Sequence, residues 1–145
     1  MNMPSNNWDI LFVDDSQTEI NYLKLLFQLT DIPLNPTFIN SAQQAIESLE
    51  NTSSDQFPDI VIVDINMPLM DGFEFAKVYM EKFGKKFPNT CFFIYSTSIH
   101  SKDINRAERM PGVSGFIAKP FGDNTFEESI YPHLPKRKET SLDQK

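Results

Sequence analysis

The stretch Asp59–Ile65 reads DIVIVDI, and it decides the fold. Four consecutive β-branched residues fill it and Pro58 precedes it, which favours a strand buried on both faces of a sheet. Apolar runs of similar length occur at Ile10–Val13 and Cys91–Tyr95. Strands buried on both faces are typical of parallel sheets that helices cover, so the sequence predicts an α/β protein.

Helical patterns alternate with these runs along the chain. We expect helices from Ser16, from Ser41, over Asp71–Phe83, over Ser101–Met110 and from Thr125, and further strands at Thr37–Ile39 and Val113–Ala118. Three of the helices, those from Ser16, Ser41 and Thr125, begin with a capping-box pattern. Because five strands alternate with five helices, we predict a doubly wound (βα)5 domain with a parallel sheet and helices on both faces.

Composition narrows the class of protein. The chain has 145 residues and a net charge of -7, which argues against nucleic acid or an anionic membrane as a partner. One cysteine excludes an internal disulfide, and the first residues lack the regions of a signal peptide, so we expect a cytoplasmic protein. We divide the chain into an N-terminal extension (1–8), one domain (9–134) and a polar tail (135–145).

Polar residues stand where the predicted strands end. They are Asp14 and Asp15 after the first strand, Asp64 in the third, Ser96 and Thr97 in the fourth, and Lys119 after the fifth. In an open parallel sheet, ligands bind at the carboxyl ends of the strands. If the first and third strands are neighbours, three carboxylates and one lysine meet at this edge.

The charges of this group predict a chemistry. Three carboxylates stay ionised together only beside positive charge, which Lys119 and one Mg²⁺ ion would supply. Oxygen ligands suit Mg²⁺, and there is no local His/Cys cluster for Zn²⁺. A carboxylate beside Mg²⁺ and a lysine is suited to attack on phosphorus, so Asp64 could form an aspartyl phosphate with Ser96 or Thr97 as the nearest donor.

Four ordered motifs carry a resemblance to a known family. They are ILFVDDSQ (10–17), VIVDINMPLMDG (61–72), FFIYSTS (92–98) and GFIAKPF (115–121). They closely resemble the receiver domain of two-component response regulators, the family that includes the chemotaxis regulator CheY, over roughly Asp9 to Tyr131. The resemblance implies a flavodoxin/CheY-like fold with the strand order 2-1-3-4-5.

The resemblance also implies a role for each acid and for the lysine. Asp64 would be the phosphoacceptor, Asp15 a direct Mg²⁺ ligand and Asp14 a ligand through water. Asn66 would offer its backbone carbonyl to the metal. Lys119 would pair with Asp64 and then with the phosphoryl group, and the bond between Lys119 and Pro120 is typically cis in the family.

A second set of residues would convert phosphorylation into a signal. Ser96 takes the family's switch hydroxyl and Phe116 its aromatic switch, although the run Ser96-Thr97-Ser98 leaves Thr97 open as the hydroxyl. If Ser96 is the switch, Thr97 could hinder access to phosphorus. Asn66 and Ser98 would tune dephosphorylation. Repacking of Phe116 would alter the surface formed by the fourth helix, fifth strand and fifth helix.

The expected function is a phosphorylation-activated switch of a two-component phosphorelay. A histidine kinase or histidine phosphotransfer protein would supply phosphate, and an unidentified downstream protein would be contacted through the surface just described, which could also form a homodimer. Little chain follows Lys119-Pro120, so we expect no output domain. The protein would not be an enzyme, although it could assist its own phosphoryl transfer and dephosphorylation.

Two other functions compete with this one. The first is a pseudo-receiver, an interaction module that works without phosphorylation. The second is a phosphatase of the haloacid-dehalogenase type, which uses an aspartate nucleophile and a general acid two residues later. Asn66 stands at that position and cannot give a proton to a leaving group. Each polar residue also has a local interpretation, such as Asp15 and Ser16 capping a helix.

Overall fold

The computed structural model describes residues 7–98 and 100–135. Most of the predicted N-terminal extension (1–8) and polar tail (135–145) lies outside the described residues, so these two boundaries stay predictions. Within the described part of the chain, no helix is long and apolar enough to cross a membrane.

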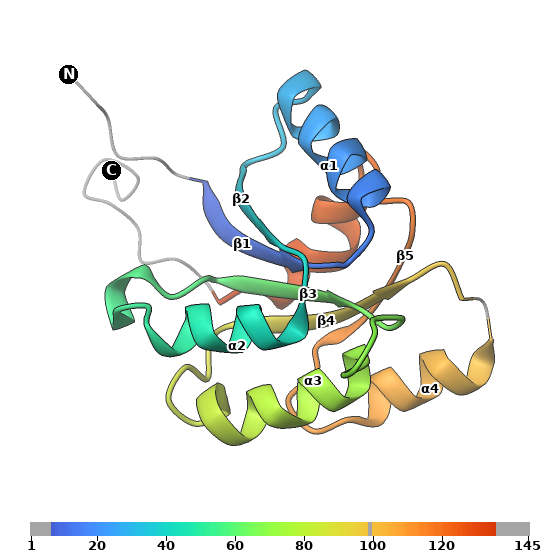
Figure 1. Cartoon of the computed structure of the whole chain (residues 1–145). Coiled ribbons are helices and arrows are strands. Elements are labelled where there is room, and N and C mark those ends of the chain that lie inside the picture. Colours follow the sequence, from blue (N-terminus) through green and yellow to red (C-terminus); the bar gives the residue numbers. More distant parts are fainter. Residues whose placement is uncertain (1–6, 99, 136–145) are drawn as a thin grey trace.

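Five parallel strands form one sheet in the order β2-β1-β3-β4-β5 (Figure 1). The strands are β1 (Trp8–Val13), β2 (Leu34–Ile39), β3 (Ile60–Asp64), β4 (Cys91–Ser96) and β5 (Gly115–Ala118). The α-helices are α1 (Gln17–Leu29), α2 (Ala42–Glu50), α3 (Gly72–Tyr79) and α4 (Ser101–Arg109). This arrangement confirms the predicted fold class and strand order.

Shorter helical segments complete the chain. A 3₁₀ turn spans Ser54–Gln56 (η1), and a π-helix continues α3 over Met80–Gly84 (η2). The fifth helix of the prediction is a π-helix over Phe126–Ile130 (η3), followed by a 3₁₀ turn over Tyr131–His133 (η4). The protein therefore has five strand–helix units, but its last helix is not an α-helix.

Two apolar layers hold the helices on the sheet. In β3, Val61 and Val63 belong to one layer, while Ile60 and Ile62 belong to the other, as the two-residue period of a strand requires. The first layer packs under α2, α3 and α4, and the second under α1 and η3 (Figure 1). The strands of the centre are thus buried on both faces, which explains their continuous apolar sequence.

β1, β2 and β5 start two or three residues away from their predicted starts. β2 starts at Leu34 rather than at Thr37 and includes Pro36, which lacks a backbone N–H. An edge strand tolerates such a residue because only one side of it is paired. β5 starts at Gly115 rather than at Val113, because the Val113 amide donates to the Met110 carbonyl at 3.1 Å in the turn that follows α4.

The helix caps follow the predicted residues only in part. Ser16 and Ser41 accept from the backbone N–H three residues ahead, at 3.2 and 3.1 Å. The predicted cap at Thr125 is wrong, because Thr125 is itself helical and its hydroxyl accepts from the Gly122 amide at 2.9 Å. A complete capping box occurs instead at Asp71, which exchanges hydrogen bonds of 2.8 and 2.9 Å with Glu74 at the start of α3.

The start of α3 is packed directly on the end of β3. The Gly72 amide donates to the Ile65 carbonyl at 2.8 Å. A Cβ atom on Gly72 would lie 2.5 Å from the Asp64 carbonyl oxygen and 2.9 Å from the Ile65 Cα, and both of these are backbone atoms that cannot rotate away. Glycine is therefore required at this position for close approach.

The close packing predicts the effect of adding one methyl group. Gly72→Ala should lower the free energy of unfolding by about 2 kcal/mol or more, because overpacking against backbone forces a shift of the chain. Urea unfolding measures the change. Gly84→Ala is the matched control, since its Cβ would lie 3.5 Å from the Met80 sulfur, an ordinary contact. Equal unfolding free energies for the two variants would contradict a steric requirement for glycine at position 72.

Candidate functional site

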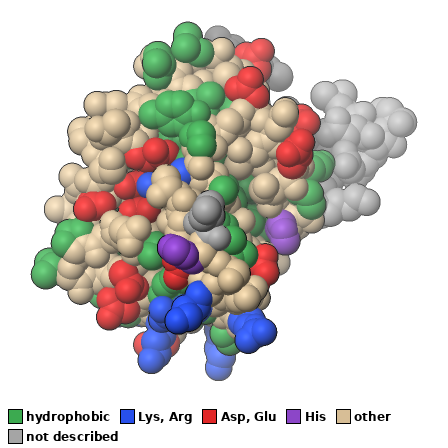
Figure 2. Space-filling model, turned by 90° about the vertical axis from the view of Figure 1, so that its right-hand side faces the viewer, with side chains coloured by type: hydrophobic (Ala, Val, Ile, Leu, Met, Phe, Trp, Pro, Cys, Tyr) green, Lys and Arg blue, Asp and Glu red, His purple; other side chains and the backbone are tan. Residues whose placement is uncertain are grey.

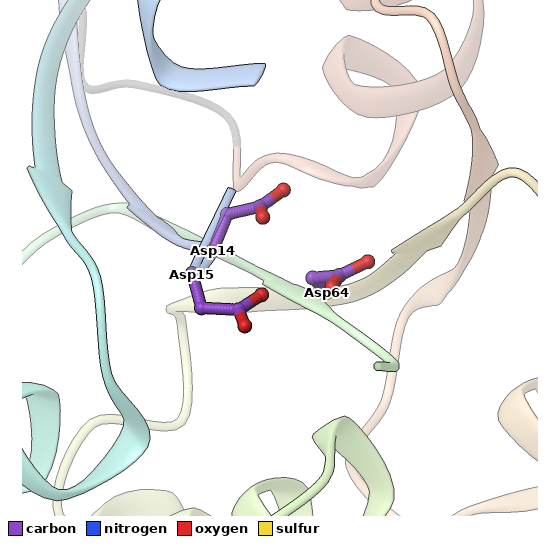
Figure 3. A group of neighbouring side chains, drawn as sticks. All are labelled: Asp14, Asp15 and Asp64. Carbon is purple, nitrogen blue, oxygen red and sulfur yellow. The ribbon is translucent and has the colours of Figure 1, made fainter. Parts of the chain in front are cut away.

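The three predicted acids meet at the carboxyl edge of the sheet. Asp14 and Asp15 follow β1, and Asp64 is the last residue of β3, the adjacent strand. One carboxylate oxygen from each lies within 4.8 Å of the others, and Figure 3 shows the three carboxylates directed into a common space. The strand register explains the meeting, because Val13 pairs with Val63 one residue before Asp14 and Asp64.

Lys119, the residue that follows the edge strand β5, joins this group of acids. Its Nζ lies 2.8 Å from Asp14 Oδ2 and 3.1 Å from Asp64 Oδ1. The Lys119 backbone N–H donates to the Ser96 carbonyl at 2.9 Å, which ties the residue after β5 to the end of β4. The Lys119–Pro120 peptide bond is cis. The predicted acids and lysine therefore form one contiguous ionic cluster.

The members of the cluster differ in exposure. Asp14 is 1% exposed and Asp64 is 6% exposed, whereas Asp15 faces solvent. Asp14 Oδ1 also accepts from the Ser16 backbone N–H at 2.9 Å, so both of its oxygens are engaged. The interpretation of Ser16 as a helix cap is thus correct too, and the capping and the ionic roles coexist at the start of α1.

Burial and neighbouring charges shift the proton affinities of the site. The pKa of Asp64 is raised from 3.8 to about 6. Burial is the largest cause of the rise, the charge of Asp14 adds to it, and the charge of Lys119 opposes it. Burial alone would lower the pKa of Lys119, but its hydrogen bond to Asp14 and the charge of Asp64 raise it, so the ammonium stays protonated. The group carries a net charge of -2 when all three acids are ionised.

The hydroxyl residues after β4 take different positions. Ser96 is 1% exposed, and its Oγ accepts from the Ser98 backbone N–H at 3.0 Å. Ser98 Oγ donates to Asp103 Oδ2 in the first turn of α4, at 2.8 Å. Thr97 is exposed. A continuous set of hydrogen bonds therefore runs from the end of β4 into α4, and Thr97 is not part of it.

The remaining predicted residues lie around the cluster. Asn66 is exposed, two residues after Asp64. Phe116 is half-buried in β5, opposite Ile94 of β4, and it packs against the layer under α2, α3 and α4. A role for Phe116 would therefore act through packing.

The donor set of this cluster fits a hard divalent cation. The three acids offer only oxygen, they come from two adjacent strands, and a single lysine leaves their charge incompletely balanced. Among the acids, histidines and cysteines of the described residues, these three acids lie close enough together to share a metal ion. Asp14, Asp15 and Asp64 are therefore the residues that would hold Mg²⁺.

One residue at the site was not predicted. Tyr95, counted from the sequence as part of an apolar strand, pairs with Asp64 in the strand register, and the Lys119 ammonium lies 5.0 Å from the centre of its ring. Its position one residue before Ser96, at the end of a run that otherwise lacks a polar side-chain oxygen, was the signal available in the sequence.

The raised pKa of Asp64 predicts how stability depends on pH in EDTA. The folded state keeps the Asp64 proton up to about pH 6 while the unfolded chain loses it near pH 3.8, so wild-type stability falls over this interval. Asp64→Asn cannot titrate. Its advantage over wild type in urea unfolding should therefore grow between pH 4 and 6 and then level off, at up to about 3 kcal/mol. An advantage that does not vary with pH would contradict a raised pKa of Asp64.

Comparison with known proteins identifies relatives of this chain. The family model of the response regulator receiver domain matches residues 10–131. The chemotaxis protein CheY of Halobacterium salinarum is 29% identical over 125 residues, which cover 83% of this chain and 92% of that protein. CheY-3 of Vibrio cholerae is 31% identical over 127 residues, covering 87% and 91%. The sensor histidine kinase CheAY of Helicobacter pylori is 30% identical, but this chain spans only 14% of its length.

Solved structures agree with these relatives. A response regulator receiver protein from Dyadobacter fermentans superimposes with a TM-score of 0.77 at 26% identity, covering 88% of this chain and 98% of that one. A two-component response regulator from Cytophaga hutchinsonii has a TM-score of 0.76 at 22% identity, covering 84% and 93%, and shows the fold alone. With its acidic cluster, its lysine and this family match, the chain belongs to the response regulator receiver domain family.

Proposed function

We propose that this chain is a phosphorylation-activated signalling switch that accepts a phosphoryl group on Asp64. The observation that carries the proposal is the position of the Lys119 ammonium, 3.1 Å from Asp64 and 2.8 Å from Asp14, inside a group of three carboxylates. A nucleophilic carboxylate and a fixed cation on the same edge of the sheet are the parts that phosphoryl transfer to aspartate needs.

The transfer step follows from these positions. An Asp64 oxygen attacks phosphorus of a phosphohistidine, and an O–P bond forms as the P–N bond breaks. The leaving imidazole keeps the electron pair and takes up a proton. Lys119 then pairs with the phosphoryl oxygens, whose charge would otherwise be repelled by Asp14 and Asp15. Asp64 is mostly ionised above pH 6, so it is available as a nucleophile at neutral pH.

Mg²⁺ fits this site and would be held by Asp14, Asp15 and Asp64, with the Asn66 backbone carbonyl as a further ligand. When bound, it supplies positive charge to the phosphoryl oxygens. The chain itself holds the carboxylates together and keeps Lys119 beside them. The buried ion pairs of Lys119 with Asp14 and Asp64 support this role.

For the switch hydroxyl we propose Ser96 rather than Thr97. Ser96 is buried at the end of β4, next to Lys119 through a backbone hydrogen bond, and Thr97 faces solvent. If phosphorylation draws the Ser96 hydroxyl toward Asp64, its bond from the Ser98 amide must break. Because Ser98 also holds Asp103, the change would reach α4 directly, and half-buried Phe116 would repack beside it.

The proposed output surface is formed by α4, β5 and η3. On α4, Lys102, Arg106 and Arg109 lie within roughly 60° of one another around the helix, at 3.6 residues per turn. Figure 2 shows Lys and Arg side chains gathered at the lower edge of the molecule, where α3 and α4 lie. In an otherwise acidic chain, this positive stripe suits a downstream protein that presents an acidic segment.

Membership of the receiver family suggests the phosphoryl donor and the residues that control dephosphorylation. A histidine kinase or a histidine phosphotransfer protein in the cytoplasm would donate the phosphoryl group. Exposed Asn66 and Thr97, together with Ser98, would tune dephosphorylation, with Thr97 limiting access to phosphorus. We class the chain as a phosphoacceptor that assists its own phosphorylation and dephosphorylation. A homodimer through the output surface stays a prediction.

The phosphatase alternative lacks a group that it needs. Turnover of a phosphate ester requires an acid to protonate the leaving oxygen, and the position two residues after Asp64 is the amide Asn66. The pseudo-receiver alternative does not need buried Asp14 and Lys119 at hydrogen-bond distance, because such a module would function without a charged site. Chemical phosphorylation and a phosphoryl mimic distinguish both alternatives from the proposed switch.

Chemical phosphorylation tests the acceptor. With Mg²⁺ and acetyl phosphate, wild type should gain one phosphoryl group, which intact mass spectrometry detects. Asp64→Asn should gain none, while Asp31→Asn, which changes an exposed acid remote from the site, should match wild type. A label on Asp64→Asn at the wild-type level would reject Asp64. Sustained turnover of p-nitrophenyl phosphate by wild type would favour the phosphatase.

Beryllofluoride with Mg²⁺, a mimic of the phosphoryl group, tests the switch. Amide signals of β4, α4 and β5 should shift in wild-type NMR spectra. Ser96→Ala should weaken these shifts several-fold, because the hydroxyl that follows the phosphoryl group is lost, and Thr97→Ala should leave them nearly unchanged. The reverse order would assign the role to Thr97, and unmoved signals in wild type would favour a pseudo-receiver.

A further inference from the structure

The hydroxyl of Tyr95 has two hydrogen-bond partners. Tyr95 is 1% exposed and lies opposite Asp64 in the β3–β4 register. Its hydroxyl donates to Glu19 Oε2 of α1 at 2.5 Å and accepts from the Phe121 backbone N–H at 3.1 Å. Two residues that are 76 positions apart in sequence thus meet at this hydroxyl.

Phe121 is held at both of its backbone polar groups. Its N–H is bound by Tyr95, and its carbonyl accepts from the hydroxyl of Tyr22, another residue of α1. Phe121 follows Lys119 by two residues. On its other side, Lys119 is fixed by its own amide, which donates to the Ser96 carbonyl at 2.9 Å. The short segment that carries Lys119 is therefore anchored at both ends.

Such anchoring matters because a lysine side chain is flexible. Four rotatable bonds separate the Lys119 backbone from an ammonium that must stay within hydrogen-bond distance of two carboxylates. The Tyr95 ring lies on a third side of the ammonium, at 5.0 Å. One side chain thus both flanks the ammonium and holds the backbone from which it extends.

We propose that Tyr95, oriented by Glu19, is a positioning residue that sets where Lys119 meets the phosphoryl group. The inference rests on the proposed phosphorylation of Asp64. The Glu19 carboxylate defines the direction of the hydroxyl, so the oxygen lone pair faces the Phe121 amide. Burial raises the pKa of Tyr95 well above its usual range, so the hydroxyl is a permanent donor to Glu19.

Four single variants separate this role from simple packing. Tyr95→Phe keeps the ring and removes the hydroxyl, and Glu19→Ala removes its acceptor; each should slow phosphorylation by acetyl phosphate at saturating Mg²⁺ by about 10-fold, since small misplacements of a reacting group are costly. Glu19→Gln keeps an acceptor oxygen and should stay within about 2-fold of wild type. Tyr79→Phe removes a hydroxyl buried in the other layer and should also match wild type.

A double-mutant cycle asks whether Tyr95 acts through Lys119. In a Lys119→Gln background, Tyr95→Phe should cause no further loss of rate, because the group it positions is gone. A loss of the same size in both backgrounds would overturn the proposal, and so would a wild-type rate in Tyr95→Phe. Mg²⁺ affinity, measured by calorimetry, should change less than about 2-fold in Tyr95→Phe and Glu19→Ala, because neither residue is among the three acids.

The failure of this inference differs from the failure of the proposed function. If wild type is phosphorylated on Asp64 and Tyr95→Phe reacts equally fast, only the positioning role is wrong. If wild type is not phosphorylated, the proposed function itself fails. Thermal unfolding of each variant establishes that it is folded, and Glu19→Ala, which alters a half-exposed residue, keeps the test open if Tyr95→Phe does not fold.

Discussion

The buried contact between the Lys119 ammonium and the carboxylates of Asp14 and Asp64 is the interaction on which the site depends. Two acids that are almost completely removed from water would repel each other strongly without it. The contact with Asp14 is made across two strands, because β3 and β4 lie between β1 and β5 in the sheet. The parallel order of the strands is therefore what brings the lysine to the acids.

This ionic group and the two apolar layers have opposite requirements. The layers need continuous apolar strands, and β3 and β4 provide them up to the strand end, as in Val63 followed by Asp64. The charged residues of the site lie where β1 and β3 end, and exposed Asp15 marks the boundary with solvent. The fold thus keeps its core free of charge and still holds charged groups close together.

Sequence reasoning predicted the fold, the order of elements and the meeting of Asp14, Asp15, Asp64 and Lys119, because the ends of parallel strands share one edge. It missed contacts that depend on side-chain direction. The hydroxyl of Tyr95 reaches Glu19 on another element, and no local pattern connects the two. The sequence also does not show which of several local donors a hydroxyl will bind. Thr125 matches a capping pattern, but its hydroxyl accepts from the Gly122 amide instead. The complete capping box begins at Asp71.

The close approach of Gly72 to the Asp64 backbone leaves the start of α3 little freedom to move. Backbone atoms of α3 contact the end of β3, and a complete capping box holds the first turn of the helix. Toward α4, by contrast, the hydrogen bonds that link Ser96, Ser98 and Asp103 involve side-chain hydroxyls, which can rotate. We therefore expect a rearrangement that begins at Asp64 to move the end of β4 and α4 rather than the start of α3.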